Sequence, residues 1–459
     1  MRMKFDKSSQ LVLVGAASLL AASLVTACSQ LTQTLTVDFV YVACAKAAGA
    51  NNYGEINVFE INSESGRMRQ IPTSPFPSQG RNPVAEAVSV DYGSLFVVNE
   101  DDNTIVQFGI GTDGKLYPYN TVNTPGIFPL AIAVTKSNMF VVDLYQPLPL
   151  CSDAEPCSGS IGVFPLTAAS GSTPVGIQTP PVTNSAVNGQ YWPLTLTGPN
   201  ASHVIVPTAV NVLASGAYVY VSAYDSSAMP NVGYVFGFWV VPAGTSASAP
   251  ATIPSGATCP APPTPPVPVP PANETADPGG TLCLLNNSPY PAGVRPSAIA
   301  SGSVGSGSNA VPVVYVTDFA IGKVLGYNAS SGNLTPLAGS PYPAGNQPSA
   351  IVVDPSYPYA YVANSEDSNV TGYSISSSGA LSSIGTYASG LQPVAIGIDP
   401  STEHFLYTLN FLDNTVSGFE LSTTNGTLLD SQLSPFPSNT NPTAVAAIPH
   451  NGTGGGVQP

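Results

Sequence analysis

Two glutamates and an arginine are the residues of this sequence best suited to chemistry. Glu86 occupies a repeated position at which the six other copies hold Ile or Val, and Glu100 directly follows the strand-like run 95–99. A carboxylate can activate water as a general base, and an arginine can stabilise the oxyanion that forms at an ester carbonyl. Glu86, Glu100 and Arg295 are therefore the candidate catalytic residues for the hydrolysis of an ester or lactone.

Glu86 also has an interpretation that involves no substrate. A carboxylate at an otherwise aliphatic position needs a partner or a raised pKa. Arg81 or Arg295 could be that partner at the mouth of a channel, and Glu86 could equally point into a wet channel or pair locally. The sequence leaves these alternatives open.

A second set of candidates precedes a phrase, Pro-x-Ala, that occurs seven times. The residue before this Pro is an amide or a guanidinium in five copies, and Phe128 and Val206 break the pattern. Such groups suit a polar ligand, although amides also cap strand ends. The candidate ligand-binding residues are Asn82, Arg81, Arg295, Gln347, Gln392 and Asn441.

Other catalytic and metal-binding signals are weak. The three histidines, His203, His404 and His450, lie in a connector, a turn and the tail, so no convergent histidine pair is expected. There is no phosphate-binding glycine loop and no Gly-x-Ser-x-Gly turn. The acidic runs 99–103 and 364–369 have oxygen atoms that suit calcium, but acidic turns are common without a metal. We expect no cofactor.

The elements that must position these residues are repeats. The Pro-x-Ala phrase alternates with a β-aromatic run that ends in Asn or Asp in its five clear copies, at a basic spacing of roughly 45 residues. The copy 347–390 contains four strand-like runs separated by turn residues. We therefore predict an all-β protein, a seven-bladed β-propeller of four-stranded antiparallel blades. The Pro-x-Ala copies begin at Pro83, Pro129, Pro207, Pro296, Pro348, Pro393 and Pro442.

The order of the two motifs predicts how the ring closes. The repeats begin with the β-aromatic run and end with Pro-x-Ala, so the last blade combines a C-terminal inner strand with three strands from about 39–71. Inner strands that start on one face, here called face one, place the loops after Asn99, Asp143 and Asn364 on that face. We expect the loops of both close cysteine pairs, Cys151 with Cys157 and Cys259 with Cys283, on face one as well. The Asn and Asp side chains are expected to bond locally within turns.

The N-terminal segment predicts export. Residues 1–27 read as a lipoprotein signal peptide with Cys28 as the lipidated residue, and 28–37 as a tether. The propeller spans 38–450, with a Pro-rich insertion at about 249–282 and a tail at 451–459. An oxidising compartment favours disulfides within the two close cysteine pairs and leaves Cys44 over. We therefore expect a lipid-anchored protein of the cell envelope.

The net charge limits the partners. The chain carries −15, and removal of 1–27 takes away three positive charges and one negative charge, which leaves −17. So acidic a protein is repelled by nucleic acid and by anionic headgroups. We expect a monomer that contacts the membrane only through its anchor.

The stretch 82–100 resembles the first complete blade of the lactonase-type seven-bladed propellers, which include 6-phosphogluconolactonase-like enzymes, and of related YVTN-repeat surface proteins. The connector SPYPAG or SPFPS, which recurs from Ser74 onward, also resembles bacterial members. The resemblance spans roughly 39–448 and implies the propeller fold and lactone hydrolysis. It also implies histidines and an arginine just after the inner-strand prolines. The comparable copies here have no histidine, and Arg295 precedes its Pro.

Two functions follow, and we place a recognition module first. In that interpretation the protein is a ligand- or protein-recognition or scaffold module at the cell envelope, with a glycan, a lactone or an envelope protein as its partner. The alternative is a divergent lactonase that hydrolyses a sugar lactone. The missing histidines favour the module, and the retained blade 82–100 favours the enzyme.

Overall fold

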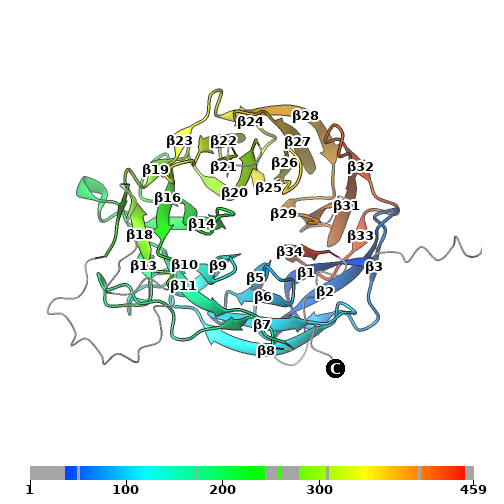
Figure 1. Ribbon diagram of the computed structural model, residues 1–459, viewed down its shortest axis with the longest axis horizontal. Coiled ribbons are helices and arrows are strands. Elements are labelled where there is room, and N and C mark those ends of the chain that lie inside the picture. Colours follow the sequence, from blue (N-terminus) through cyan, green and yellow to red (C-terminus); the bar gives the residue numbers. More distant parts are fainter. Residues whose placement is uncertain are drawn as a thin grey trace, which may run out of the picture.

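The computed structural model describes residues 37–48, 52–171, 173–242, 256–260, 279–305, 310–400 and 405–449. These residues form seven antiparallel sheets that radiate around a central axis (Figure 1). The prediction of an all-β, seven-bladed propeller is confirmed. Within the described ranges, no helix is long and apolar enough to cross a membrane. The predicted signal peptide, Cys28, most of the tether, most of the Pro-rich insertion and the tail lie outside the described residues, as do His404 and His450.

The blades are numbered here from the first complete sheet, so that blade 1 is β5 to β8 and blade 7 is β1 to β4 with β34. The innermost strands of blades 1 to 7 are β5 (Pro83–Val88), β9 (Ile127–Val134), β14 (Ile205–Val212), β20 (Pro296–Val304), β25 (Pro348–Val353), β29 (Pro393–Ile398) and β34 (Pro442–Ile448). The second strands are β6 (Ser94–Asn99), β10 (Asn138–Tyr145), β15 (Tyr218–Asp225), β21 (Val311–Asp318), β26 (Tyr359–Asn364), β30 (Phe405–Asn410) and β1 (Val37–Ala48).

The outer half of each blade is less regular. The third strands are β7 (Thr104–Ile110), β11 (Ser160–Thr167), β16 (Val232–Val240), β22 (Lys323–Asn328), β27 (Asn369–Ile375), β31 (Thr415–Leu421) and β2 (Tyr53–Asn62). The fourth strands are β8 (Leu116–Asn123), β12 (Gly176–Ile177), β18 (Leu282–Leu285), β23 (Thr335–Pro336), β28 (Leu381–Ala388), β32 (Leu428–Asp430) and β3 (Met68–Gln70). Short additional strands are β4 (Phe76–Pro77), β13 (Trp192–Pro193), β17 (Ala257–Thr258), β19 (Tyr290–Pro291), β24 (Tyr342–Pro343) and β33 (Phe436–Pro437), and the short helix η1 is Gly198–Asn200.

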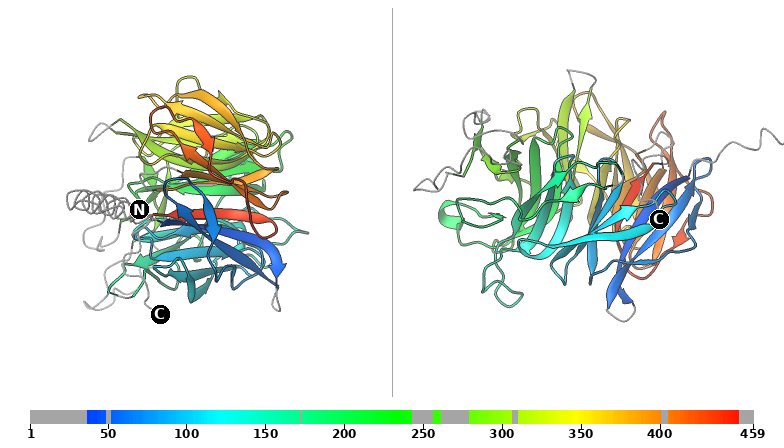
Figure 2. Two further views of the ribbon diagram at one scale, coloured as in Figure 1. Left: turned by 90° about the vertical axis from the view of Figure 1, so that its right-hand side faces the viewer. Right: turned by 60° about the horizontal axis from the view of Figure 1, so that its bottom comes forward.

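The N- and C-terminal segments share blade 7, as predicted. β1 pairs antiparallel with β34, with Tyr41 opposite Ala446 and Ala43 opposite Ala444. In Figure 2 the blue strands of the N-terminal segment lie beside the red strand of the C-terminal segment. Phe39 lies opposite Ile448, so β1 starts and β34 ends on the same face, opposite face one and here called face two. The ring is closed by pairing residues about 400 positions apart.

The hydrophobic core lies between neighbouring blades. The second strands are buried on both sides, since β6 and β26 have no exposed residue, and they read as continuous apolar runs. Phe96 and Val98 of blade 1 pack against Met139 and Val141 of blade 2. The small Ala85 joins this cluster, so the alanine of the Pro-x-Ala phrase is core, but it faces the neighbouring blade and not the axis. Each blade therefore depends on its neighbours for a buried face.

The recurrent Ser-Pro connector completes the outer edge of a blade. In blade 7 the connector separates the two short strands β3 and β4, both of which pair with β2. The Ser74 hydroxyl accepts a hydrogen bond of 2.9 Å from the Val58 N–H of β2, and so fills the break in the ladder. Ser288, Ser340 and Ser434 accept equivalent bonds from the N–H groups of Gly237, Gly326 and Gly418.

The two disulfides lie on opposite faces, which corrects the prediction that both lie on face one. Cys151–Cys157 closes the loop that follows β10 and lies on face one. Cys259–Cys283 lies on face two, because Cys283 pairs with Trp239 at the end of β16, and Trp239 pairs with Tyr218 where β15 starts. The third strand of a blade runs from face one to face two, so an insertion after it leaves from face two. Cys44 is a free, buried thiol.

Candidate functional site: the channel mouth on face one

The residues that precede the inner prolines form the rim of the channel on face one. Five of them have left-handed backbone, with φ between 52° and 59°: Asn82, Phe128, Gln347, Gln392 and Asn441. Proline disfavours the right-handed helical conformation for the preceding residue, and the rim carbonyls face the second strand, including that of Arg295, which is not left-handed. The Asn82 carbonyl accepts a hydrogen bond of 2.9 Å from the Glu100 N–H, and the Gln392 carbonyl accepts one of 3.0 Å from the Phe411 N–H. The rim is a repeated backbone feature, and the side chains of these five residues are half-buried at the mouth.

The buried Asn and Asp at the ends of the second strands hold the connectors that reach this rim. Asp318 accepts from the N–H groups of Val294 and Arg295, more than 20 residues earlier, and also from Ala320, two residues later. Asn364 accepts from Gly345 at 3.0 Å. The predicted local turn bond is therefore present at Asp318, and the bond to the connector is the feature that positions the rim.

Asn82, Arg81 and Glu100 form one network on blade 1. Asn82 Nδ2 donates to Glu100 Oε2 at 2.6 Å, while the Arg81 guanidinium pairs with Asp102 at 2.6 Å. Burial raises the pKa of Glu100, and the negative charges of Asp101 and Asp153 add to the shift. Glu100 is thus half-buried at the mouth and carries a proton more readily than a free glutamate.

The Cys151–Cys157 loop contributes to the same side of the mouth. Asp153 belongs to this loop, and the Tyr145 hydroxyl at the end of β10 donates to it at 3.2 Å. The Tyr145 ring packs edge-on against Phe128, with the ring centroids 6.0 Å apart. The disulfide therefore holds an acidic loop beside Glu100.

Glu86 does not reach the mouth. It lies in the middle of β5, and neither of its carboxylate oxygens has a hydrogen-bond partner, although both are buried. Burial raises its pKa well above the usual value, and a weak interaction with the Ala446 backbone offsets this in part. Its charge acts on Tyr41 and Cys44, so it faces blade 7. The carboxylate of Glu86, enclosed between the two blades, has no access to a substrate.

Neither arginine pairs with Glu86, contrary to the partnership considered above. Arg81 is bound to Asp102 on the exposed surface. Arg295 lies on blade 4, and its guanidinium carbon is 5.4 Å from the ring centres of both Tyr224 and Phe319. The two rings hold the cation in place by cation–π contact, and Arg295 has no ion pair among the described residues. Arg295 is therefore an exposed, uncompensated positive charge at the mouth.

His203 forms a pair that the sequence analysis missed. Its Nδ1 lies 2.5 Å from Oδ2 of Asp225, whose side chain is only 2% exposed while that of His203 is 29% exposed. A buried carboxylate on Nδ1 fixes the orientation of the ring, and Nε2 makes no hydrogen bond to the described residues, which is the arrangement of a general base in hydrolases. The feature that brings the two residues together is the register of β14 and β15. Pro207 lies opposite Ala223 and Ile205 lies opposite Asp225, so the connector that holds His203 runs alongside Asp225.

The described residues contain no group of three or more His, Cys, Asp or Glu side chains able to hold a metal ion. In the first acidic run, Asp101 and Asp102 bind Asn82 and Arg81. In the second run, Asp367 binds the backbone and side chain of Asn346. The acidic turns proposed for calcium thus have protein partners.

A comparison with family models finds a match to part of the chain. Residues 322–446 match the family described as "Lactonase, 7-bladed beta-propeller", a segment that runs from the turn before β22 into β34. The predicted resemblance to lactonase-type propellers is confirmed for this part of the chain. A comparison with curated protein sequences finds no match.

Solved structures extend the likeness to the whole propeller. A protein from Bacteroides fragilis proposed to be a 6-phosphogluconolactonase has a TM-score of 0.61 and 17% identity, and the alignment covers 91% of this chain and 99% of that one. The periplasmic gluconolactonase of Pseudomonas aeruginosa has a TM-score of 0.58 and 16% identity, with 90% and 99% covered. At this identity the likeness establishes the fold alone.

Proposed function

We propose that this lactonase-type propeller hydrolyses a lactone bound over the channel mouth on face one. The observation that carries the proposal is the His203–Asp225 pair, a general-base arrangement on the face where the rim residues gather. The names of the structural relatives, gluconolactonase and 6-phosphogluconolactonase, support a sugar lactone as the substrate class. The proposal therefore favours the enzyme over the recognition module.

The chemical step needs one base and one cation. His203 Nε2 takes a proton from water, and the resulting hydroxide attacks the carbonyl carbon of the lactone. The electron pair of the C=O bond moves to oxygen, and the Arg295 guanidinium stabilises this oxyanion. The intermediate then expels the ring oxygen, which receives the proton from His203. The product is the open-chain hydroxy acid.

The two groups flank the end of one strand. Asp225 and Tyr224 are consecutive residues of β15 whose side chains point to opposite sides of the sheet. Asp225 orients His203, and the ring of Tyr224 carries Arg295. A substrate over the end of β15 can approach both groups.

Glu100 is the competing base. It faces the mouth, and burial has raised its pKa toward the range that suits proton transfer. Its hydrogen bond from Asn82 also fits a positioning or binding role for the substrate hydroxyls. Glu86 is not proposed as a base, because its carboxylate is enclosed between blades.

The location of the N-terminal segment bears on the predicted anchor. β1 starts on face two, so a lipidated Cys28 would attach the propeller to a membrane from that side. The residues 28–37 can span at most roughly 30 Å when extended. Face one would then point away from the membrane toward dissolved substrates.

The decisive test is hydrolysis of a panel of sugar lactones by the purified chain. We expect turnover of at least one lactone, and a fall in kcat of about 100-fold or more in His203→Ala. Asp225→Asn should lower kcat while KM changes little, because the residue acts through His203. His450→Ala is the matched control and should retain full activity. The proposal is contradicted if no lactone of the panel is hydrolysed. It is also contradicted if His203→Ala and Asp225→Asn keep full activity.

A recognition module is the second candidate, and one observation favours it. Exposed apolar side chains stand at the tips of the loops on face one, among them Leu150 (75% exposed), Met229 (93%) and Leu412 (62%). Loops on a rigid scaffold often carry binding residues, and a protein partner on face one would bury these apolar side chains. Saturable binding of an envelope protein or a glycan without any lactone turnover would favour this candidate.

A further inference from the structure

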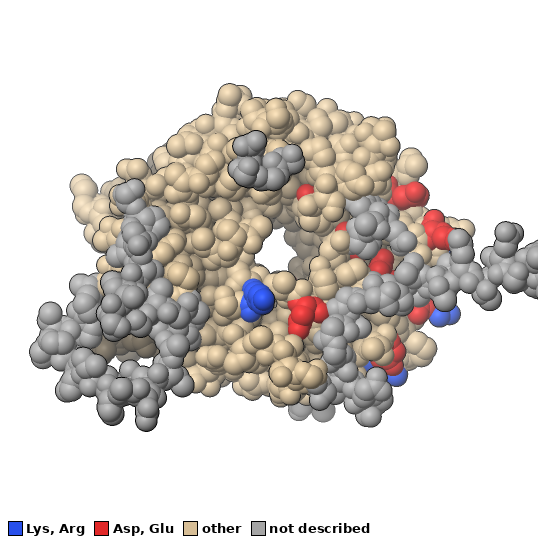
Figure 3. All heavy atoms as spheres, in the orientation of Figure 1, with Lys and Arg blue, Asp and Glu red and all other residues tan. Residues whose placement is uncertain are grey.

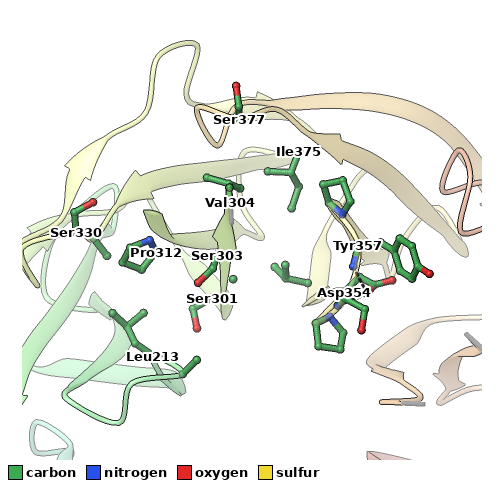
Figure 4. A pocket seen from close by; sticks show the side chains of 18 of the residues that line it. Leu213, Ser301, Ser303, Val304, Pro312, Ser330, Asp354, Tyr357, Ile375 and Ser377 are labelled. Atoms are coloured by element: carbon green, nitrogen blue, oxygen red, sulfur yellow. Dashed lines mark hydrogen bonds between the residues drawn. The ribbon is translucent and has the colours of Figure 1, made fainter. Parts of the chain in front are cut away.

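A large cavity lies on face two, on the opposite side of the ring from the proposed lactone site. It has a volume of about 940 Å³, which lies within the range of small-molecule sites. Its described walls come from the ends of the inner strands of three consecutive blades, 3, 4 and 5, and from the turns after β14, β22, β25 and β27. Figure 4 shows Ser301, Ser303 and Val304 of β20 on one side and Asp354 after β25 on the other, with Leu213 below them.

The described lining offers no positive charge to an anionic ligand. The described lining contains neither Lys nor Arg, and its one carboxylate is Asp354. Asp354 Oδ1 already accepts from the N–H groups of Ser356 and Tyr357, at 2.8 and 2.9 Å. In Figure 3 the sector of the disc that carries β14 to β25 shows no basic side chain on the visible face. A phosphate or a sugar acid would meet no compensating cation here, in contrast to Arg295 on face one.

The hydrogen-bonding capacity of the lining is that of free hydroxyl groups. The side chains of Ser303, Ser330 and Ser377 line the cavity and make no hydrogen bond to the described residues. A serine hydroxyl both donates and accepts, so its best partner is a group that does the same. Between these hydroxyls stand apolar surfaces from Val304 and Ile375. A sugar ring matches such a wall, because it carries hydroxyl groups at its edge and C–H groups on its face.

The walls are held by the fold and do not have to be formed by a ligand. The turn after β25 is fixed by the two bonds to Asp354 Oδ1 and by the backbone bond from Asp354 N–H to Tyr359. The turn after β22 is fixed by two backbone hydrogen bonds of Ala329. Its N–H donates to the Pro312 carbonyl, and its carbonyl accepts from the Gly332 N–H. A site with preformed walls loses little entropy when a ligand binds.

We propose that this face-two cavity is a second binding site, for a neutral polyhydroxylated ligand such as a saccharide. The free serine hydroxyls bind the ligand hydroxyls, and the apolar strip packs against the ring. Because the described lining has no basic side chain, the site prefers neutral sugars to sugar acids and sugar phosphates. The site is independent of hydrolysis, because the proposed hydrolytic groups His203 and Arg295 lie on face one.

The test is ligand-observed NMR and calorimetry on the purified chain with glucose, N-acetylglucosamine, cellobiose and maltotriose. We expect at least one neutral sugar to bind, and the matching sugar acid, such as glucuronate for glucose, to bind at least tenfold more weakly. Ser330→Trp projects an indole into the cavity from an exposed turn and should weaken binding at least tenfold. Ser331→Trp is the matched control, since the neighbouring residue does not line the cavity.

The outcomes separate this site from the lactone site. Binding that is unchanged in Ser330→Trp, or absent for every sugar of the panel, overturns the proposal. Should Ser330→Trp fail to fold, Ser377→Trp provides the same obstruction from the turn after β27. Binding that is lost in Arg295→Ala assigns the sugar to face one and also overturns the proposal. Loss of lactone turnover in His203→Ala with unchanged sugar binding is the pattern expected of two separate sites.

Discussion

The Tyr361 hydroxyl on blade 5 donates a hydrogen bond of 2.8 Å to the Gly426 carbonyl on blade 6. The same bond joins Tyr41 to Gly114, Tyr220 to Gly332 and Tyr315 to Gly379, each time from a second strand to the outer turn of the next blade. All four glycines have φ between 72° and 86°, in the left-handed region where a side chain is strained. The tyrosine of the repeated phrase thus ties each of these blades to its successor.

Loss of one of these hydroxyls should destabilise the ring. Tyr361→Phe leaves the buried carbonyl of Gly426 without its partner, and we expect a loss of about 1 to 3 kcal/mol in the free energy of unfolding. The chain contains its own control, because the hydroxyl of Tyr407 at the equivalent position is buried without a partner. Tyr407→Phe should be neutral or stabilising in the same denaturant titration. Equal losses in the two variants would show that the hydrogen bond is not the cause.

The carboxyl of Glu86 should make stability fall as pH rises. Burial raises its pKa in the folded protein, so the folded state binds more protons than the unfolded state above pH ~4.5. The favourable contribution is complete below that pH and is lost as the pH rises toward the folded pKa. We expect Glu86→Gln to remove this part of the slope, and Glu86→Ile, which restores the residue type of the other copies, to raise stability at pH 7. Unfolding measured between pH 4 and 8 tests both variants, and a slope unchanged by Glu86→Gln would contradict the assignment.

Asp143 should add a second pH dependence to the stability, over a narrower pH range than Glu86. Burial raises its pKa to about 7, partly offset by hydrogen bonds from Thr124 and Gly126. The folded state again holds the proton more tightly, so stability decreases between pH ~4 and 7. Asp143→Asn places at this position the residue that blades 1, 5 and 6 use, keeps an acceptor for Gly126 and cannot titrate. The variant should flatten the slope in this window, as measured by chemical unfolding at each pH.

Arg295 should act on the transition state and on the charged product. Arg295→Ala removes the cation, and we expect kcat/KM for the best lactone to fall about 100-fold, with weaker inhibition by the hydroxy acid product. Arg295→Lys keeps the charge but not the planar group that lies between Tyr224 and Phe319, so only partial recovery is expected. Arg69→Ala is the control, because Arg69 pairs with Glu60 away from the mouth. Equal effects at both positions would point to the overall charge of the protein.

The two disulfides should differ in their contribution to stability. Chain entropy favours the crosslink with the larger loop, and the sequence separations are 24 for Cys259–Cys283 and 6 for Cys151–Cys157. The expected losses on replacing each pair by serine are about 3.5 and 2.4 kcal/mol respectively. The Cys151–Cys157 variant should also affect lactone turnover, because its loop borders Glu100. Thermal unfolding and turnover measured on both variants check the two expectations.

The sequence by itself determined the fold and the composition of the rim. Two phrases in fixed order predicted seven blades and the shared blade 7, because a propeller repeats one local pattern and joins sequence neighbours in space. The same repetition identified the rim residues, each of which directly precedes an inner strand: Asn82, Arg295, Gln347, Gln392 and Asn441. The strand directions also placed the Cys151–Cys157 loop correctly.

Only the tertiary structure decided which side chains meet. An arginine was one partner considered for Glu86, but the side-to-side alternation of β5 turns the side chain into the seam with blade 7, whose inner strand β34 lies about 360 positions away in the sequence. His203 and Asp225 come together because the β14–β15 ladder extends beyond the repeated phrase, and that extension is not part of the repeat. The face-two cavity depends on the lengths of turns in three blades. Such contacts depend on strand register and side-chain direction. A repeated pattern does not determine these at the positions where the copies differ.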